Sequence, residues 1–567
     1  MRSAWRYSFV FTLGWTVLTA SAADVLVRGP ESDALKNVRI ALSGLSSSGG
    51  ELPDEARLVK TAADALKPFG YYEATCTVTY RGEKAEMTVT PGRQIQLAEP
   101  AVVIDGPAAE EPAVKKLLAG IPRVGSPLKH ADYEAFKSAL NNLALSEGYF
   151  DAEFETSRLE VSVKKGEARW VITWHSGERW RFGQTVFEGS QIDEDRLTSL
   201  VPYRDNEAFS ADRAAALSKN LSATGWFQSV AVTPEFSRAA DRTIPMRAVV
   251  TPRAKNEVEL GLGVDSDVGL NGEIQWTKPW INRRGHSLKF TSAVSAKEQT
   301  VSGQWKIPEK KDPVNSYWLV SSGYKHTDLN DTKSQSVTAT FSRTTLLASG
   351  WQRTPSVTAS QTRFTQADVT ESTFLLYPGL SFSRIRQRGG LSPNWGDSQR
   401  YTAEISRREW GSGTDFALFR LQDSILRTWR DRHRFVGRIT LGVIAADDLD
   451  QVPPEKRFFA GGDKSIRGYG YQKISPQDDE GQLIGASKLV TGTLEYQYRV
   501  TGGWWGAVFA DAGDAVRSVS DFDVKKGAGF GVRWDSPVGP VKLDLAWPLG
   551  DKTESGVHFY VGLGTQW

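Results

Sequence analysis

The feature that most constrains the fold is a long alternation of apolar and polar residues, which begins near residue 256 and continues to the end of the chain. Alternation with a period of two places successive side chains on opposite faces of an extended strand. The segments EVELGLGVDS, TVSGQWKIP and TLEYQYRV all follow this pattern, and no helical period interrupts them. The apolar face of the first strand carries Val258, Leu260, Leu262 and Val264, and the last strand has Val557, Phe559, Val561, Leu563 and Trp567 on one face and Gly562 and Gly564 on the other.

Such a series of strands predicts a transmembrane antiparallel β-barrel of the outer-membrane type, since barrel strands show their apolar residues only in alternation. Nowhere does the chain approach 18 consecutive apolar residues, which excludes an ordinary helical membrane protein. A soluble β-sandwich or propeller would alternate too, but no repeat of blade length is visible. We expect sixteen strands of roughly 19 residues each including connections, although twelve of roughly 26 would also fit.

The first 22 residues have the composition of an export signal. Two arginines precede a short apolar run, and Ala20-Ser21-Ala22 forms an A-x-A cleavage site. The run is too short to cross a bilayer as a helix. We therefore expect residues 1–22 to be a signal peptide and the mature protein to be exported from the bacterial cytoplasm.

Between the signal and the barrel, one pattern occurs three times. Short strands ending in a glycine turn (VLVRGP, VVIDGP, TVFEGS) are followed by a helical segment, a glycine with an aromatic pair (GYYEA, GYFDA, GWFQS) and two alternating segments. In the second helix, Tyr133, Phe136, Leu140, Leu143 and Leu145 are expected to face a core. The pattern predicts three α+β modules, at residues 23–99, 100–182 and 183–255, followed by a barrel at 256–567. Their sheet edges could accept a strand from a partner, or the modules could be spacers.

Composition argues against several function classes. The formal charge is only +2, a single cysteine (Cys76) cannot build a disulfide framework, and the six histidines lack the spacing of metal ligands. GGDKSIRG has an aspartate where a phosphate loop needs glycine, and no nucleophile elbow occurs. We expect no enzymatic activity, no metal and no cofactor.

One segment departs from the alternation. FFAGGDKSIRGYGYQKISP, residues 458–476, lies between two regular strands in a connection of about 45 residues. Its aromatic residues and glycines argue that it is ordered. Long ordered loops are commonly functional, so this loop and its arginine, Arg467, are the leading candidates for a site.

These residues resemble a known family. Three repeats shaped like polypeptide-transport-associated (POTRA) domains, followed by a barrel with IRGY in a long late loop and FADAG in a following strand, are similar to the POTRA-plus-barrel assembly family of the outer membrane, which is related to BamA. The penultimate segment GFGVRWDSPVGPVKLDLAWPL and the terminal Trp567 fit the same family. The repeat number and the length are most similar to the TamA type. The matching residues are Ile466, Arg467, Gly468 and Tyr469 in the loop and Phe509, Asp511 and Gly513 in the strand.

The resemblance implies that the loop folds into the barrel and that its arginine contacts the FADAG strand. Strand parity agrees, because lipid-facing Val508 and Ala510 leave Phe509 and Asp511 facing inward. Arg533 is expected to face inward by the same argument. We therefore expect an Arg467–Asp511 pair that holds the loop in the lumen.

The resemblance also implies a function without bond-making chemistry. The seam between the first strand (Val258, Leu260, Leu262) and the last (Phe559, Gly562, Gly564, Trp567) would open sideways, and a substrate strand would add to its edge. The expected role is an outer-membrane assembly factor for autotransporters and other outer-membrane proteins, with its repeats in the periplasm and a TamB-like protein docked on the first repeat. Two alternatives stay open: a secretion pore for a soluble partner protein of the two-partner type, and a role in lipid transport to the outer membrane.

Overall fold

The computed structural model describes residues 25–46, 54–81, 84–390, 392–537, 539–551 and 554–563. The expected signal peptide lies outside this part of the chain, as do two residues of the expected seam, Gly564 and Trp567. Within the described residues, no helix combines the length and the apolar character needed to cross a membrane.

The first module packs two helices on a three-stranded sheet. Its last strand is central, with the order β1-β3-β2; β1 is parallel and β2 antiparallel to β3. Both β1 and β2 are therefore edges of this sheet. The elements are β1 (Val25–Arg28), α1 (Asp33–Ser46), α2 (Glu55–Leu66), β2 (Thr75–Arg81) and β3 (Lys84–Thr90).

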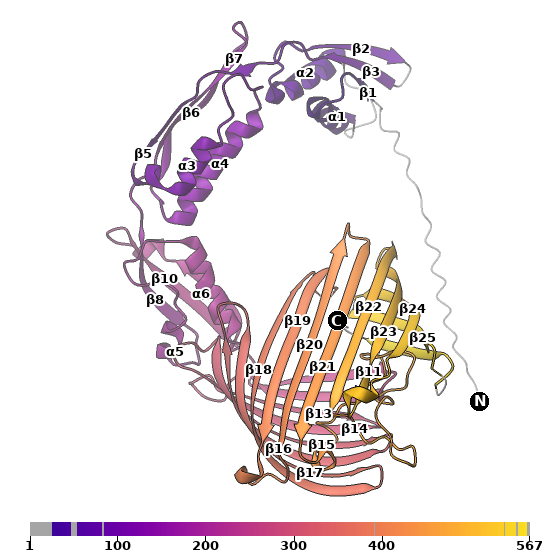
Figure 1. Cartoon of the computed structure of the whole chain (residues 1–567). Helices are drawn as coiled ribbons and strands as arrows, with labels where there is room; N and C mark the ends of the chain where they lie inside the picture. The colour runs from indigo at the N-terminus through magenta and orange to yellow at the C-terminus, as the bar shows by residue number, and fades with distance from the viewer. Residues whose placement is uncertain are drawn as a thin grey trace, which may run out of the picture. The chain divides into compact units, whose positions relative to one another are not determined.

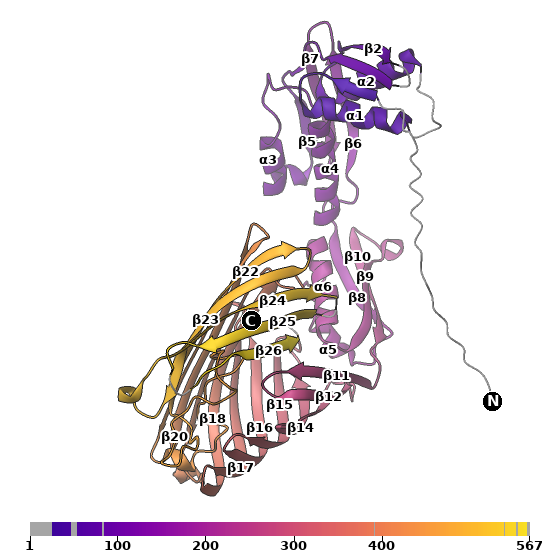
Figure 2. The ribbon, with the colours of Figure 1, turned by 90° about the vertical axis from the view of Figure 1, so that its right-hand side faces the viewer.

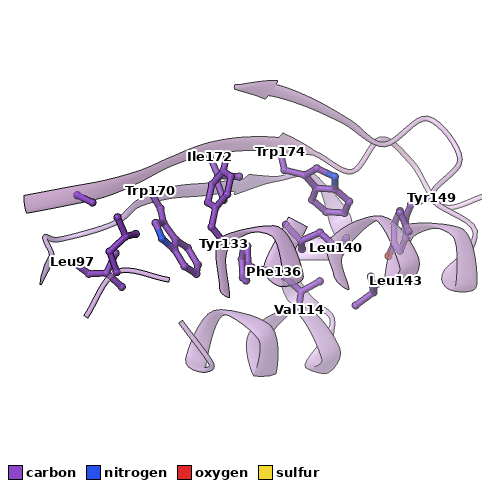
Figure 3. Close-up of a cluster of buried hydrophobic side chains, with 14 of the residues drawn as sticks. Leu97, Val114, Tyr133, Phe136, Leu140, Leu143, Tyr149, Trp170, Ile172 and Trp174 are labelled. Carbon is purple, nitrogen blue, oxygen red and sulfur yellow. The ribbon is translucent and has the colours of Figure 1, made fainter. Parts of the chain in front are cut away.

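The second module has an aromatic-rich core, shown in Figure 3. Trp170, Ile172 and Trp174 project from one face of its central strand toward the long helix, because every second residue of a strand shares a face. Its elements are β4 (Gln96–Leu97), β5 (Ala101–Asp105), α3 (Pro112–Ala119), α4 (His130–Glu147), β6 (Glu153–Ser162) and β7 (Glu167–His175). β7 pairs in parallel with β4 and β5 and antiparallel with β6.

One residue expected in this core is not there. Tyr133, Phe136, Leu140 and Leu143 of α4 are buried, whereas Leu145 is 59% exposed. Leu145 follows Leu143 by two residues, about 200° around the helix, so it points away from the sheet. Ala144 is buried instead.

The third module has the same strand order as the first, β8-β10-β9. Two expected module boundaries fall inside strands or sheets: residues 96 and 97 pair in the second sheet, and β8 begins at Arg181 rather than after residue 182. The elements are β8 (Arg181–Glu188), α5 (Glu194–Thr198), α6 (Ala211–Ala223), β9 (Phe227–Pro234) and β10 (Thr243–Pro252).

The rest of the described chain forms one sheet of sixteen antiparallel strands in sequence order, curled into a nearly closed barrel (Figures 1 and 2). The predicted barrel with sixteen strands is therefore confirmed. The strands are β11 (Glu257–Asp265), β12 (Gly269–Lys278), β13 (Ser287–Ser295), β14 (Glu298–Pro308), β15 (Ser316–Leu329), β16 (Thr332–Leu346), β17 (Gln352–Gln366), β18 (Val369–Arg388), β19 (Trp395–Ser406), β20 (Phe416–Trp429), β21 (His433–Ala446), β22 (Lys488–Thr501), β23 (Trp504–Val516), β24 (Lys525–Ser536), β25 (Gly539–Pro548) and β26 (His558–Leu563).

The connection between β21 and β22, residues 447–487, is named the lumen loop here. It packs an apolar cluster against inward-facing side chains of five strands. Gly442 of β21 makes room for it, since a Cβ there would overlap the ring of Phe458. The cluster consists of Val452, Phe458, Ala460, Ile466, Tyr469, Ile474 and Ala486 of the loop with Leu375, Tyr377, Phe416, Leu418, Ile444, Leu489 and Ala515 of the wall.

Candidate functional site: the lumen loop and the seam

The side chain of Arg467 is completely buried and forms a bidentate ion pair with Asp511 of β23. Its Nε donates to Oδ2 at 2.7 Å and its Nη2 to Oδ1 at 3.0 Å, while the backbone N–H of Arg467 donates to Oδ2 at 3.0 Å. Two parallel bonds from a planar guanidinium fix both the position and the orientation of the loop. The structure thus brings together Arg467 and Asp511, the pair that the family resemblance implied and that strand parity allowed.

Two further carboxylates complete the surroundings of Arg467. Its Nη1 donates to Glu495 of β22 at 2.8 Å and to Asp544 of β25 at 3.1 Å. A second arginine, Arg533 of β24, donates to the same two carboxylates. The cluster therefore links the loop to four neighbouring strands. Buried charges are tolerated when each is paired and hydrogen-bonded, and the two arginines and three carboxylates meet that condition together.

Phe509 and three glycines shape the space around this cluster. The Arg467 guanidinium lies 3.4 Å from the centroid of the Phe509 ring, in cation–π geometry. On β24, a Cβ at Gly527 would overlap the Arg467 carbonyl oxygen, one at Gly529 the Phe509 ring, and one at Gly531 the Asp544 carboxylate. The glycine alternation in KGAGFGVR thus leaves room for the loop.

The other residues of the IRGY segment also have defined positions. Ile466 and Tyr469 are buried in the loop's apolar cluster. Gly468 has φ of +97°, and its N–H donates to the hydroxyl of Tyr560 on β26 at 3.0 Å. That hydroxyl donates in turn to the Tyr469 carbonyl at 2.8 Å. The segment is thereby tied to the last described strand as well as to the wall.

Gly513, the third expected residue of the partner strand, allows close packing between strands of the barrel wall and does not contact Arg467. It has φ of +156°, and a Cβ there would overlap the carbonyl oxygen of Val490 on β22. Glycine is therefore required for close approach of β22 and β23 at this point.

The seam differs from every other junction in the described barrel. Each strand from β11 to β26 pairs with the next in a ladder, whereas the one backbone hydrogen bond across the described part of the seam comes from the turn after β11, from Ser266 N–H to the Val561 carbonyl of β26 at 3.4 Å. Figure 2 shows the two strands next to each other. The expected seam residues Val258, Leu260, Leu262 and Phe559 are all exposed, and Gly562 lies in register with Lys542 of β25.

Four residues of this site were not singled out by sequence reasoning as partners of the loop: Glu495, Arg533, Asp544 and Tyr560. A usable signal existed, because each lies on the inward face of an alternating segment, as in TLEYQYRV and VKLDLAW. Alternation predicts that these residues face inward, but it does not predict which of the inward-facing polar residues contact the loop.

Comparison with known proteins agrees with this architecture. Residues 255–567 match the Omp85 superfamily domain, and residues 24–91 match the family described as POTRA domain TamA domain 1. Because the first match covers more than half of the chain, this protein belongs to the Omp85 superfamily. The prediction of a POTRA-plus-barrel protein related to BamA is confirmed.

Two curated relatives match shorter segments. Outer membrane protein assembly factor BamA from Nitratidesulfovibrio vulgaris Hildenborough is 32% identical over 133 residues, covering 22% of this chain and 17% of that protein. Outer envelope protein 80, chloroplastic, from Arabidopsis thaliana is 33% identical over 121 residues, covering 19% and 15%. The matched segments span less than a fifth of each relative.

A solved structure shows the same fold. BamA from Haemophilus ducreyi lacking POTRA domains 1–3 superposes with a TM-score of 0.70 at 14% identity. The superposition covers 83% of this chain and 99% of that one.

Proposed function

We propose that this protein is an outer-membrane assembly factor that helps insert or translocate other outer-membrane proteins through the seam between β11 and β26. The observation that carries the proposal is that, among the described residues, one backbone hydrogen bond crosses the seam, from the turn after β11 to β26. An edge with free N–H and C=O groups can accept another strand, and a substrate strand with unpaired groups is stabilised by that addition.

The surface of β11 supports this role. Leu262 is 85% exposed, and Val258 and Leu260 are also mostly exposed. A lipid-facing apolar row next to an unpaired edge would let a new strand pair while its own apolar face stays in lipid. The barrel would thus lie in the bacterial outer membrane with the modules in the periplasm. The proposed activity is non-enzymatic and requires no cofactor, because it exchanges hydrogen bonds rather than covalent ones.

The partners proposed are autotransporters and other outer-membrane proteins as substrates, and a TamB-like periplasmic protein at the first module. The match of residues 24–91 to POTRA domain TamA domain 1 supports this second assignment. So does the open sheet edge of that module, where β1 and β2 each have one unpaired side in the described sheet.

A disulfide across the seam tests the function. The pair Ser266→Cys and Val561→Cys, in a Cys76→Ala background, would join the end of the first hairpin to β26 where the one backbone bond of the described seam lies. The expected result is loss of substrate assembly in liposomes under oxidising conditions and recovery on reduction. The matched control is Leu543→Cys with Val561→Cys, which joins β25 to β26 where they already pair. Full assembly with the seam joined would contradict the proposal.

The two alternatives predict other outcomes in the same preparation. A secretion pore would pass a soluble protein across the bilayer with the seam disulfide intact, because its route is the lumen. A lipid transporter would exchange labelled lipid between vesicles in the absence of any protein substrate.

A further inference from the structure

The corner of the lumen loop at Gly461, Gly462 and Asp463 contacts the first hairpin of the barrel. The backbone N–H of Asp463 donates to both carboxylate oxygens of Asp267, at 3.3 and 3.2 Å. Asp267 lies in the turn between β11 and β12 and is buried although that turn ends an otherwise exposed strand. The side of the seam formed by β11 is therefore attached to the loop.

The same segment of the loop also binds the other side of the seam, formed by β25 and β26. The Asp463 carboxylate forms a buried ion pair with Lys542 of β25. Five residues further on, the N–H of Gly468 and the carbonyl of Tyr469 bond the hydroxyl of Tyr560 on β26. Residues 463–469 thus contact strands on both sides of the seam, where one backbone hydrogen bond joins the described residues directly.

The local sequence is suited to this contact. Gly462 has φ of +97°, and a Cβ on it would lie 3.1 Å from each carboxylate oxygen of Asp267 and 2.9 Å from the Tyr471 ring. Only glycine lets the corner approach the turn this closely without displacing it. A second contact also fixes the turn: the side chain of Lys297, between β13 and β14, donates to the Asp267 carbonyl.

We propose that Asp267 and the Asp463 corner of the lumen loop form a latch, through which the loop rather than the strand ladder keeps the seam closed. Across the described seam there is one backbone bond at 3.4 Å to a neutral carbonyl, whereas at the latch one N–H is shared between the two oxygens of a buried carboxylate, at 3.3 and 3.2 Å. Bonds to a charged acceptor are about twice as strong as neutral ones, so the latch outweighs the ladder. Movement of the loop corner then releases the first hairpin.

The latch assigns a conformational role to two residues outside the IRGY and FADAG segments. It rests on the proposed function only for what passes through the open seam, because the closure itself is a property of the barrel. A substrate that displaces the loop would open its own insertion site, and in the absence of substrate the seam would stay shut.

Distance measurement between two spin labels tests the latch without any substrate. Leu260→Cys on β11 and Phe530→Cys on β24 are both lipid-facing and exposed, and Cys76→Ala removes the native thiol. In Asp267→Ala, the ratio of long-distance to short-distance populations should rise about tenfold, as expected for loss of a hydrogen bond to a charged group. Asp267→Asn keeps an oxygen acceptor and should show a smaller rise.

The matched control is Asp328→Ala. Asp328 is the penultimate residue of β15, next to the turn that leads into β16. Its carboxylate pairs with Lys333 rather than with the loop. This variant should leave the distance distribution as in the parent. Circular dichroism checks that each variant is folded, and Gly462→Ala, which crowds Asp267 without removing it, is a second route to the same opening.

Each outcome separates the latch from the proposed function. An unchanged distribution in folded Asp267→Ala and Gly462→Ala overturns the latch, whatever the seam does in assembly. A widened distribution in a protein that assembles substrate equally well with the seam disulfide supports the latch and contradicts the proposed function.

Discussion

Two strands of the barrel sheet, β11 at one end and β23 near the other, have the same alternating sequence but opposite degrees of burial. In β23, inward residues such as Phe509 and Asp511 are buried while outward Val508 is exposed. In β11, Leu260 and Leu262 are exposed outward, and the inward Glu259 is exposed too. The lumen loop covers the wall from β22 to β25 with charged and apolar contacts and reaches the first hairpin mainly at its turn. β22 to β25 are therefore held by broad contacts with the loop inside the barrel, whereas β11 is held by its pairing with β12 and by the loop at the turn that follows it.

This difference is the physical basis for the proposed opening at the seam. A strand that pairs on one side and packs on neither face has little to lose on separation, whereas β23 would have to abandon a buried ion-pair cluster. Four experiments test this difference between the two strands.

The largest effect is expected from the Arg467 cluster. Arg467→Ala leaves Asp511, Glu495 and Asp544 buried near one another, which should cost roughly 3–5 kcal/mol in barrel unfolding by denaturant. Arg400→Ala is the control, since Arg400 faces the lumen on β19 and has no recorded ion pair among the described residues. Asp511→Ala and the double variant complete a cycle; additive losses would show that the pair does not act as a unit.

The glycines of β24 should show an intermediate effect. Gly527→Ala would place a methyl group against the Arg467 carbonyl and force the loop to shift, at a cost of about 1–3 kcal/mol. Gly492→Ala on β22 is matched to it, because the nearest atoms there are 3.9 Å from the added Cβ. Equal unfolding midpoints for the two variants would contradict close packing of the loop on β24.

Hydrogen exchange tests the wall comparison directly. Amides of β11 should exchange at least roughly tenfold faster than those of β23, because local opening of an edge strand costs less than opening of a packed one. Mass spectrometry of peptides from the intact protein in detergent measures this. Similar protection of the two strands would mean that the seam is as stable as the rest of the sheet.

The smallest effect is expected for an exposed ion pair in the second module, which contrasts with the buried cluster of the barrel. Hydrogen bonds to Glu155 and Asp105 raise the pKa of His175 at the end of β7. A raised pKa means that protonated His175 stabilises the pairing of β7 with its neighbours below about pH 6.5, and that this contribution is lost as pH rises through the folded-state pKa.

The protection of the β5 and β6 amides, measured relative to the intrinsic exchange rate at each pH, should therefore decrease slightly as pH rises over that range. His175→Gln should remove the pH dependence. A dependence that persists in His175→Gln would assign it to another group.

Much of the architecture was predictable because it depends on local periodicity. Alternation predicted the sheet and which residues of FADAG face inward, and helical spacing predicted four buried residues of α4. The prediction that Leu145 is buried was wrong, because an error of one residue in a helical pattern moves a side chain by about 100° around the helix. The module boundaries shifted by a few residues since β4 pairs in parallel with β7, a strand some seventy residues later, and no local signal marks such a pairing.

What the sequence by itself determined is the period of each region, and with it the modules, the barrel and the inward row that holds Asp511. What only the tertiary structure decided is which inward charges meet: Arg467 with Glu495 and Asp544, Asp463 with Lys542, and Asp267 with the loop corner. The physical reason is that alternation selects a face but not a distance. The path of a loop through a lumen depends on where glycines leave space and where buried charges can all be paired, and both depend on strands far apart in the chain.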